Sequence, residues 1–307
     1  PRSSSAASDV YKRQIQEDLG LCSYFKHHKQ KIYYFLASMR EYRDYLKKNN
    51  FKVNYITLDK NISNFKDYFE GLKSFLVSKN IFKINIFEIE DLEFRKKFEQ
   101  FCKDNKIELT FHKSPMFLVS RSDYQGMVTT KKPQLANFYS NVRKTFEIFV
   151  KENKPIGDKW SFDEDNRKRV PKEYESPKSY MFESKHYEDI KKLINKFFAN
   201  HFGILEKKII FPMNFKDSFK VLDNFINEKL ENFGHYEDFI RINDPYINHS
   251  LISAPLNMGL LTPNDVLDRL NLISYSKVGI NNYEGFIRQI FGSVSYTHLT
   301  LPTKNEV

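Results

Sequence analysis

The chain has 307 residues, a formal net charge of +10 and 29 Phe and 18 Tyr residues. This length allows two domains with apolar cores, and the excess of Lys and Arg favours an anionic partner such as nucleic acid. A Lys-rich composition without nucleic-acid contact explains the same charge, so both interpretations stay open. No apolar run has membrane-spanning length and no secretory signal is recognisable, so we expect a cytoplasmic protein without a membrane partner.

The two cysteines, Cys22 and Cys102, lie far apart and form no Cys-x-x-Cys motif. Their spacing predicts neither a disulfide framework nor a metal site, and it is typical of a reducing compartment.

Both ends of the chain have an unusual composition. Residues 1–14 are rich in Ser and Ala, and residues 293–307 interrupt a helical pattern directly after Gly292. Both segments are similar to translated sequencing-adapter read-through, as found at the edges of assembled metagenomic fragments. We therefore interpret 1–14 and 293–307 as non-native ends and expect the native part, residues 15–292, to be truncated on both sides.

Strand-like and helix-like segments alternate between residues 31 and 111. The expected strands are 31–37, 53–58, 83–89 and 107–111, and the expected helices are 38–48, 64–79 and 92–103. This alternation predicts a parallel α/β sheet with right-handed crossovers. Because neither a Gly-x-Gly-x-x-Gly nor a Walker motif is present, the sheet is not expected to be an ordinary dinucleotide or P-loop domain.

The middle of the chain has the features of a connector. A helix is expected over 133–152, with four apolar residues on one face and four basic residues near the other. The basic set is Lys131, Lys132, Arg143 and Lys144, and it is either a solvated face or a contact to the DNA backbone. In the segment 153–180, Trp160 and Phe162 are expected to fix the linker to a domain, and Arg167 is expected to pair with carboxylates.

Helical patterns resume at 186–202 and 215–232 and continue to the end of the native part. Within 283–291 the apolar residues fall on one helical face; they are Tyr283, Phe286, Ile287, Ile290 and Phe291. Ser253 is placed to cap a short helix that contains Pro255 and ends at Gly259. Thr262 is expected to cap the next helix, with Pro263 at its first position.

Two features of this region have both a structural and a functional interpretation. Ser250 and Ser253 at a helix N-terminus could bind an anion such as phosphate, or Ser253 could be a cap alone. Glu284 and Arg288 share a helix face at i,i+4, which is also typical of a solvated ion pair.

Taken together, the motifs of 234–292 resemble the flavin domain of the photolyase/cryptochrome superfamily. They are Gly-His-Tyr-Glu-Asp at 234–238, His-Ser-Leu-Ile-Ser at 249–253 with Asn257 after it, and Glu-Gly-Phe-Ile-Arg-Gln at 284–289. The best match is the bacterial photolyase-related branch with an iron–sulfur cluster. One departure is Ala254, because the family usually has Pro directly after the second Ser.

The resemblance implies that the helical region binds FAD. Carried over by motif position, the FAD-binding residues are Tyr236, His249, Ser250, Leu251, Ile252, Ser253, Asn257, Glu284, Arg288 and Gln289. Of these, His249, Ser250, Ser253 and Asn257 would line the phosphates and the ribityl chain, and Glu284, Arg288 and Gln289 the isoalloxazine or lesion side.

The resemblance extends to an antenna domain near the N-terminus. Ser38, Met39, Arg40 and Glu41 are expected in the loop after the strand 31–37, where the family binds a lumazine-type antenna chromophore. The family pattern is Ser-Ala-Met-Arg, whereas this chain has Ala37 before Ser38. An alternative for Arg40 and Glu41 is an ion pair at the start of a helix.

The expected fold is therefore α/β followed by all-α, with a Rossmann-like antenna domain and the first helices of an FAD-binding domain. The domains are residues 15–125, with the first strand missing, a connector at 126–185 and the start of the flavin domain at 186–292. The family's His-His pair and the four cysteines of its 4Fe-4S cluster are expected only in the parent protein, beyond Gly292.

The expected parent is a monomeric, light-driven DNA photolyase, a carbon–carbon lyase that repairs UV photoproducts of the (6-4) type in damaged DNA. We expect the 307-residue chain itself to be inactive, with no catalytic residue and no metal site. One alternative is a cryptochrome-like blue-light receptor on the same scaffold. Another is an unrelated basic α/β protein that binds nucleic acid without flavin.

Overall fold

The computed structural model describes residues 13–127 and 134–291. The chain forms two compact units. One comprises the residues up to His112 together with Met181–Asp217, and the other comprises Lys113–Tyr180 together with the residues from Ser218 onward. The domain boundaries expected at 125 and 185 stay predictions.

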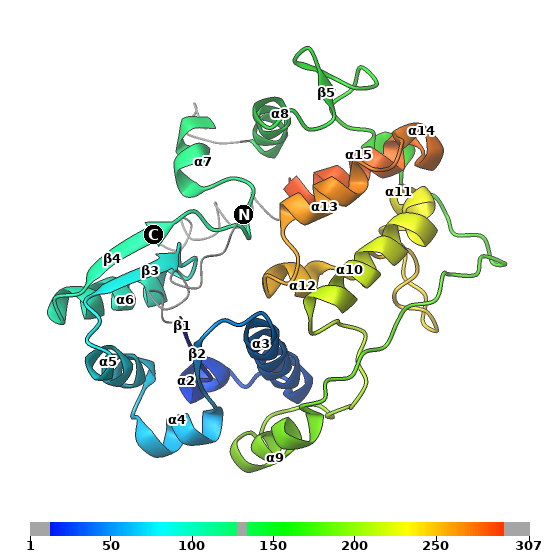
Figure 1. Ribbon diagram of the computed structural model, residues 1–307. Coiled ribbons are helices and arrows are strands. Elements are labelled where there is room, and N and C mark those ends of the chain that lie inside the picture. The colour runs from blue at the N-terminus through cyan, green and yellow to red at the C-terminus, as the bar shows by residue number, and fades with distance from the viewer. Residues whose placement is uncertain (1–12, 128–133, 292–307) are drawn as a thin grey trace. The chain divides into compact units, whose positions relative to one another are not determined.

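The first unit contains two parallel strand pairs and their connecting helices (Figure 1). β1 (Arg13–Gln16) pairs with β2 (Val53–Ile56), and β3 (Lys83–Phe87) pairs with β4 (Glu108–His112). The helices are α2 (Leu19–Ser23), α3 (Lys29–Lys48), α4 (Leu58–Asn64), α5 (Tyr68–Ser78), α6 (Leu92–Asp104) and α9 (Tyr187–Phe197). The predicted parallel α/β arrangement is confirmed, as are the expected strands that begin at Val53, Lys83 and near Ile107.

The strand expected at 31–37 is wrong, because these residues belong to α3. A short apolar run does not distinguish a strand from a buried helix by periodicity alone. Here the side chain of His28 accepts a hydrogen bond from the amide of Gln30 and caps the helix, and no Gly or Pro interrupts it before Lys48. The first strand is instead β1, which begins at Arg13, inside the segment interpreted as non-native.

The helix expected at 64–79 begins later, because α5 starts at Tyr68, and the separate helix α4 at Leu58–Asn64 was not expected from the sequence. Phe65 has an extended backbone and ends α4, and Asp67 caps α5 by accepting from the amide of Glu70. A new N-cap within three residues is sufficient to start a second helix in a different direction.

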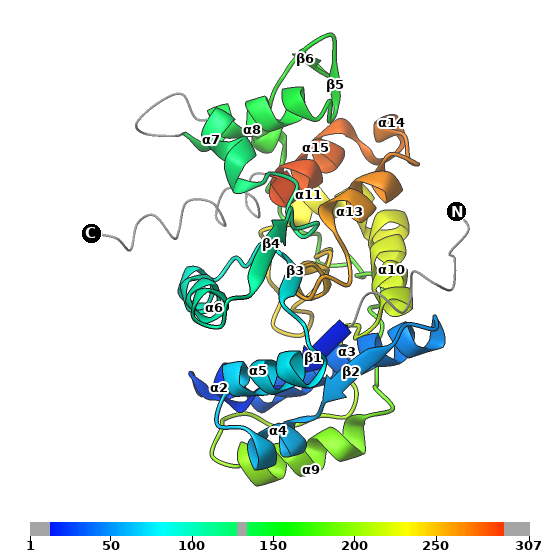
Figure 2. The same cartoon turned by 60° about the vertical axis from the view of Figure 1, so that its left-hand side comes forward.

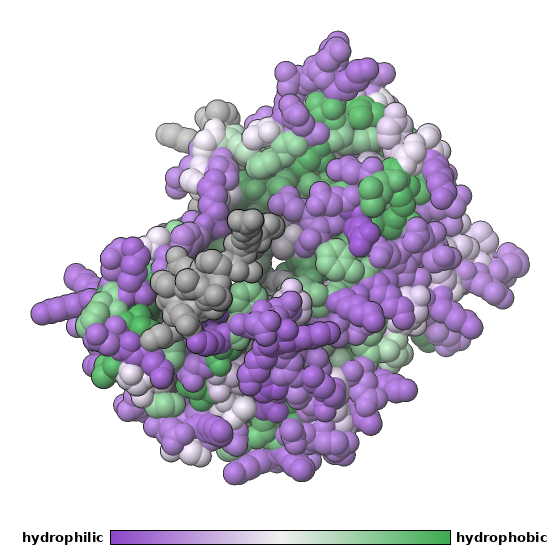
Figure 3. Space-filling view, viewed as in Figure 1, coloured by the Kyte–Doolittle hydropathy of each residue, from purple (hydrophilic) through white to green (hydrophobic). Residues whose placement is uncertain are grey.

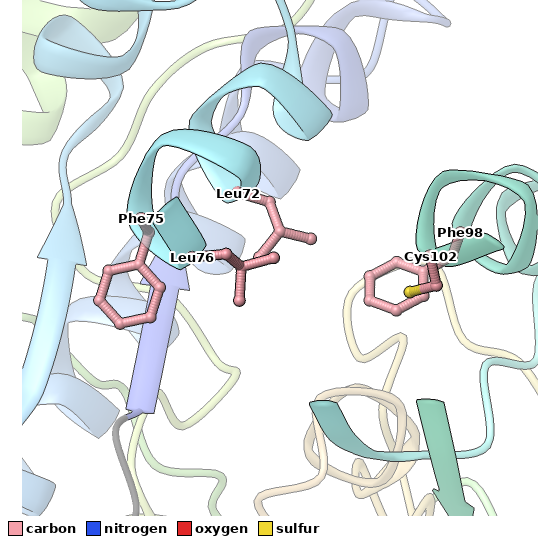
Figure 4. Close-up of a cluster of buried hydrophobic side chains, with 5 residues drawn as sticks. All are labelled: Leu72, Phe75, Leu76, Phe98 and Cys102. Atoms are coloured by element: carbon pink, nitrogen blue, oxygen red, sulfur yellow. The ribbon is translucent and has the colours of Figure 1, made fainter. Parts of the chain in front are cut away.

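An aromatic cluster forms the core between α5 and α6. Its buried members are Leu72, Phe75, Leu76, Phe98 and Cys102 (Figure 4). Phe69 packs near them with ring centroids 5.2 Å from Phe101 and 5.7 Å from Phe94. The burial of such rings is a main stabilising contribution to a unit of this size.

Over its described residues, the second unit has helices, one short hairpin and long irregular connections (Figure 2). α10 (Phe215–Asn224) begins in the first unit and continues as a π-helical turn at Phe225–Lys229 and a 3₁₀ turn at Leu230–Asn232. The other elements are α7 (Arg121–Met127), α8 (Leu135–Thr145), β5 (Val150–Lys151), β6 (Lys154–Pro155), the 3₁₀ turn Asp163–Asp165, α11 (Phe233–Tyr236), α12 (Ser253–Asn257), α13 (Pro263–Leu270), α14 (Tyr275–Val278) and α15 (Ile280–Arg288).

The helix expected at 133–152 is shorter, because α8 ends at Thr145. Glu147 and Phe149 have positive φ angles of 52°, and the hairpin β5–β6 follows. Arg143 explains the change of direction: its guanidinium donates to the carbonyls of Ile148, Phe149 and Trp160 and is fully buried. In a helix that continued to 152, the carbonyls of Ile148 and Phe149 would accept hydrogen bonds from backbone amides; here they accept from Arg143 instead.

Aromatic packing holds α11 and α15 together. The ring centroids of Phe225 and Phe286 lie 4.5 Å apart. The ring centroid of Phe233 lies 5.4 Å from that of Phe225 and 5.5 Å from that of Phe286. The spacing of the apolar residues in 283–291 predicted this buried face, and Phe286 and Ile287 are each 1 % exposed. The expected fold class, a Rossmann-like unit together with a helical one, is confirmed by the structural comparison described below.

Asp44 of α3 makes a testable contribution to the first unit. Burial raises the pKa of its carboxyl group, but hydrogen bonds from Lys185, Arg43 and His186 outweigh burial and lower the pKa from 3.8 to about 2. A lowered pKa stabilises the fold at pH values above 3.8, and this stabilisation is lost as the pH falls towards 2. We expect Asp44→Asn to lower the free energy of unfolding at pH 7 by about 1–2 kcal/mol.

The measurement is urea unfolding between pH 7 and pH 2. The difference in the free energy of unfolding between wild type and Asp44→Asn should become smaller as the pH falls. The control Asp268→Asn, at an exposed position, should have the free energy of unfolding of the wild type at every pH. A difference that stays constant with pH would contradict the role assigned to Asp44.

Candidate functional site

The linker of the second unit lies directly against the motif that begins at Gly234. The amides of Arg167 and Lys168 donate to the carbonyls of Gly234 and His235 at 3.2 and 2.8 Å. A Cβ atom on Gly234 would lie 2.4 Å from the side-chain oxygen of Asn166, so no larger residue fits without displacing the Asn166 side chain of the linker. Glycine is therefore needed here for the close approach of the two segments.

Glu284 is the buried centre of this contact. Its side chain is fully buried, one carboxylate oxygen accepts from the hydroxyl of Tyr139 at 2.9 Å, and the other accepts from the amide of Phe162 at 2.9 Å. Burial, and then the negative charge of Glu284, raise the pKa of Tyr139, so the phenol keeps its proton and donates. One carboxylate thus joins α15 to α8 and to the linker.

Arg288 lies one turn beyond Glu284 and contacts three carboxylates. Its guanidinium lies 2.7 Å from Asp163, 3.6 Å from Glu284 and 3.7 Å from Glu237. The i,i+4 pairing of Glu284 and Arg288 is confirmed, but Glu284 is fully buried and Arg288 is half-buried, so the pair is not an ordinary solvated one. The approach of Arg167 to Asp163 and Asp238, at 3.0 and 2.9 Å, confirms the expected pairing of that arginine.

Glu237 connects Arg288 to the other predicted residues. Gln289 donates to its carboxylate at 3.3 Å, and the Nε2 atom of His249 donates to its backbone carbonyl at 2.9 Å. Burial raises the pKa of Glu237, and the positive charge of Arg288 opposes this effect. The structure therefore brings His249, Arg288 and Gln289 together around Glu237.

Tyr236 belongs to a neighbouring polar and aromatic contact. Its ring centroid lies 5.0 Å from that of Tyr174, whose hydroxyl donates to Asn248 at 2.8 Å. Tyr174 is part of the linker, so Tyr236 also faces a residue that the motif comparison did not identify.

The segment from Ser250 to Asn257 is differently placed. Leu251 has a positive φ of 59°, Ile252 is buried, and α12 starts at Ser253. The prediction that Ser253 is the N-cap is wrong, because Ile252 occupies that position without a side-chain cap. Within the ranges that the structure describes, the side chains of Ser250, Ser253 and Asn257 have no hydrogen-bond partner, so their polar groups are available to a ligand.

The flanking cap predictions are confirmed. Gly259 follows α12 with a φ of 68°, as expected for a residue just beyond a helix C-terminus. Thr262 and Asp265 form a capping box at the start of α13, with Pro263 as the first helical residue.

The four residues expected in the antenna site lie in α3 and not in a loop after a strand, so this placement is wrong. Arg40 forms two hydrogen bonds with Glu17, at 2.7 and 3.0 Å, and both side chains are buried. Glu41 accepts from Ser184 at 2.7 Å, so the ion pair expected between Arg40 and Glu41 is absent. Ser38 is buried and Met39 is half-buried in the same helix.

Sequence reasoning missed several residues that organise the site. Glu237 lies inside the Gly-His-Tyr-Glu-Asp motif but is not among the predicted site residues. Asp163 and Asn166 lie in the segment 153–180, for which only structural roles of other residues were predicted. Glu17 lies just after residues 1–14, which the sequence analysis interpreted as a non-native end. Its carboxylate accepts hydrogen bonds from the hydroxyl of Tyr55 and from the amide of Leu58. The contact partners of these residues are far away in the sequence, so helix or strand periodicity does not predict the contacts.

Hydrophilic residues predominate on the face shown in Figure 3. Of the basic set, Arg143 fits neither alternative, a solvated face or a contact to the DNA backbone, because this side chain is buried against backbone carbonyls. Lys144 is exposed, and Lys131 and Lys132 lie outside the described residues.

Over 13–127 and 134–291, the structure contains no cluster of potential metal ligands and no helix that could span a membrane.

Removal of the Glu284 carboxylate should destabilise the second unit. Glu284→Ala leaves the hydroxyl of Tyr139 and the amide of Phe162 buried without their acceptors, and we expect a loss of about 3 kcal/mol in the free energy of unfolding. Glu231→Ala is the matched control, because this exposed carboxylate should change stability by less than about 0.5 kcal/mol. Equal values for the two variants in urea unfolding would contradict the role of Glu284.

Comparisons with known proteins give the geometry a family context. The chain is 28 % identical over 300 residues to a (6-4) photolyase of Agrobacterium fabrum (strain C58 / ATCC 33970), which covers 95 % of this chain and 59 % of that protein. It is 30 % identical over 148 residues to an uncharacterized protein of Acanthamoeba polyphaga mimivirus, which covers 46 % of this chain and 71 % of that protein.

A crystal structure of a bacterial class III photolyase from Agrobacterium tumefaciens has a similar fold. The TM-score is 0.57 at 14 % identity, and the match covers 96 % of this chain and 54 % of the other. The chain therefore spans somewhat more than half the length of these photolyases.

The family model for the deoxyribodipyrimidine photo-lyase-related protein matches residues 3–209, which is more than half of the chain. With this match, the chain belongs to the family of deoxyribodipyrimidine photo-lyase-related proteins.

Proposed function

We propose that this chain is part of a light-driven, FAD-dependent DNA photolyase that repairs UV photoproducts of the (6-4) type. The observation that carries the proposal is the 28 % identity to a (6-4) photolyase over 95 % of the chain. The contacts around Glu237 and Glu284 support it, because they involve the residues of the flavin-type motifs.

The residues present are suited to FAD. The unpartnered side chains of Ser250, Ser253 and Asn257 offer two hydroxyl groups and one amide on a short stretch of chain, and these groups suit phosphate oxygens and the ribityl hydroxyls. We propose that these three residues hold the phosphate and ribityl part of the cofactor. His249 would be oriented for the same purpose by its bond to the carbonyl of Glu237.

Glu284, Arg288 and Gln289 have a different proposed role. Both oxygens of Glu284 already accept from the protein, and Arg288 is surrounded by Asp163, Glu237 and Glu284. We propose that Glu284 positions the linker, and that Arg288 and Gln289 form the wall next to the isoalloxazine or the lesion. When bound, reduced and excited FAD would supply the electron for repair, and the protein would orient it and exclude water.

Further ligands belong to the same proposal. A lumazine-type antenna chromophore is proposed for the parent protein, with no binding residues assigned, because Arg40 is paired with Glu17. The 4Fe-4S cluster is proposed only for the parent protein, and UV-damaged DNA is the proposed substrate. The net charge of +10 is favourable for a DNA partner.

FAD titration of the 307-residue chain, followed by flavin fluorescence, tests the cofactor site. We expect weak binding with less than one FAD per chain, and we expect Ser253→Ala to weaken it about fivefold through the loss of one hydrogen bond. Ser63→Ala removes an exposed hydroxyl from α4 and is the matched control.

Two outcomes would contradict parts of this account. A tight one-to-one yellow complex would refute the expected weak, sub-stoichiometric binding of FAD, and equal affinities for Ser253→Ala and Ser63→Ala would refute the proposed phosphate site. The function itself is tested by illuminating a (6-4) oligonucleotide with the longer protein recovered from the source DNA. A flavin-loaded protein that leaves the lesion unchanged would overturn the repair function.

A further inference from the structure

Two segments of the first unit that are far apart in the sequence are joined into one surface. The segment 24–31 connects α2 to the first turn of α3, and the segment 201–206 follows shortly after α9. The amide of Lys29 donates to the carbonyl of Phe202 at 3.0 Å. The side-chain amide of Gln30 donates to and accepts from the backbone of the second segment, at 3.1 and 2.7 Å. These bonds hold the two segments side by side.

Large apolar side chains of both segments are exposed to solvent. The exposed fraction is 66 % for Tyr24 and for Phe25, 60 % for Phe202 and 78 % for Ile204. Exposed apolar residues scattered singly over a surface need no explanation, whereas these four lie on two segments that contact each other. Together with His28, we call them the ring patch.

The rings of the ring patch lie close together in pairs. The ring centroids of Tyr24 and Phe25 are 4.8 Å apart, and those of His28 and Phe202 are 5.3 Å apart. Gly203 has a φ of 86°, and a Cβ atom there would lie 1.8 Å from Nε2 of His28. A larger residue would displace the His28 ring, so this glycine permits the second contact.

His27 connects the two pairs of rings. Its ring centroid lies 5.2 Å from that of Tyr24 and 6.2 Å from that of Phe25, and its carbonyl accepts from Nδ1 of His201 at 2.8 Å. Burial, followed by the charges of Lys31 and His201, lowers the pKa of His27. Its imidazole is therefore neutral at neutral pH and adds a flat ring to the surface.

Lysines surround the ring patch. The first segment contains Lys26, Lys29 and Lys31 and no acidic residue, and Lys208 lies just after the second segment, whose one acidic residue is Glu206. In the part of the chain that the structure describes, none of these four lysines forms an ion pair. Their charges are therefore available to a polyanion.

Exposed rings among unpaired cations are typical of one class of partner. The bases of single-stranded nucleic acids are free to stack on aromatic side chains, and their phosphates are attracted by nearby lysines. In a duplex the faces of the bases are covered by neighbouring bases, so the same rings would contact only the backbone. The surface therefore suits a single strand better than a duplex.

We propose that the ring patch binds single-stranded nucleic acid, with bases stacked on Phe25 and Phe202 and with phosphates next to the surrounding lysines. This binding activity goes beyond the proposed repair function, because it needs neither flavin nor a lesion. Its sequence preference should be small, because every base has a face that can stack.

The probe is a fluorescein-labelled oligothymidylate of about 12 nucleotides, titrated in the dark against the full chain by anisotropy. We expect saturable binding that is tighter than the binding of a duplex of the same length. Phe25→Leu removes the ring but keeps an apolar side chain, and it should weaken binding about tenfold, whereas Phe25→Tyr should bind like wild type. Phe82→Leu is the matched control, because Phe82 is 64 % exposed in the same unit but lies outside the ring patch.

The salt dependence of binding tests the role of the lysines. For a single strand, each phosphate contact contributes about 0.7 to the slope of log affinity against log salt concentration. The double variant Lys26→Gln, Lys31→Gln should therefore reduce the magnitude of this slope by about 1.4. Lys73→Gln, which removes an exposed lysine of α5, should leave the slope unchanged.

Several results would overturn the proposal. Equal affinities of Phe25→Leu and Phe82→Leu would show that the oligonucleotide binds elsewhere on this basic chain, and equal affinities for single strand and duplex would exclude base stacking. Absence of oligonucleotide binding would also overturn it. If phosphatidylserine vesicles then bound wild type but not Phe25→Leu, the ring patch would belong to a membrane surface instead.

Discussion

The second unit depends on the burial of one carboxylate. Glu284 is fully removed from solvent, and an ionised group in that position is tolerated only if protein donors replace the lost water. Tyr139 and the amide of Phe162 are these donors, and Arg288 supplies a nearby positive charge. The position of α8, the path of the linker and the side of α15 that faces them are therefore determined together.

The first unit contains a similar arrangement. Glu17 is buried with Arg40, and it also accepts from Tyr55 and the amide of Leu58, so β1, α3, β2 and α4 meet at one carboxylate. In both units a short side chain with two acceptor oxygens joins segments that are distant in the sequence. Desolvation opposes the attraction within buried pairs of this kind, so their net contribution to stability is small, whereas removing one partner leaves an uncompensated buried group and is costly.

The sequence predicted local features well and distant contacts poorly. Periodicity located β3, α6 and the buried face of α15, and cap residues located α13, because these features depend on neighbours within a few positions. The strand expected at 31–37 and the long helix expected at 133–152 were wrong for physical reasons. The periodicity of a short apolar run does not distinguish a buried helix from a buried strand, and Arg143 turns the chain by binding carbonyls that no periodic pattern reveals. The motif comparison identified Glu284 and Arg288, whereas Asp163 and Glu237 became apparent only from the fold.

Hydrogen exchange of the Phe162 amide tests most directly whether Glu284 holds the linker. This amide lies in a segment with little regular structure, and an exposed loop amide would exchange at a rate close to that of an unfolded chain. We expect protection comparable to that of the amides inside α15, because the amide donates to a buried carboxylate at 2.9 Å. Exchange at the rate of the exposed neighbour Ser161 would show that the linker is not held by Glu284 and would contradict the account.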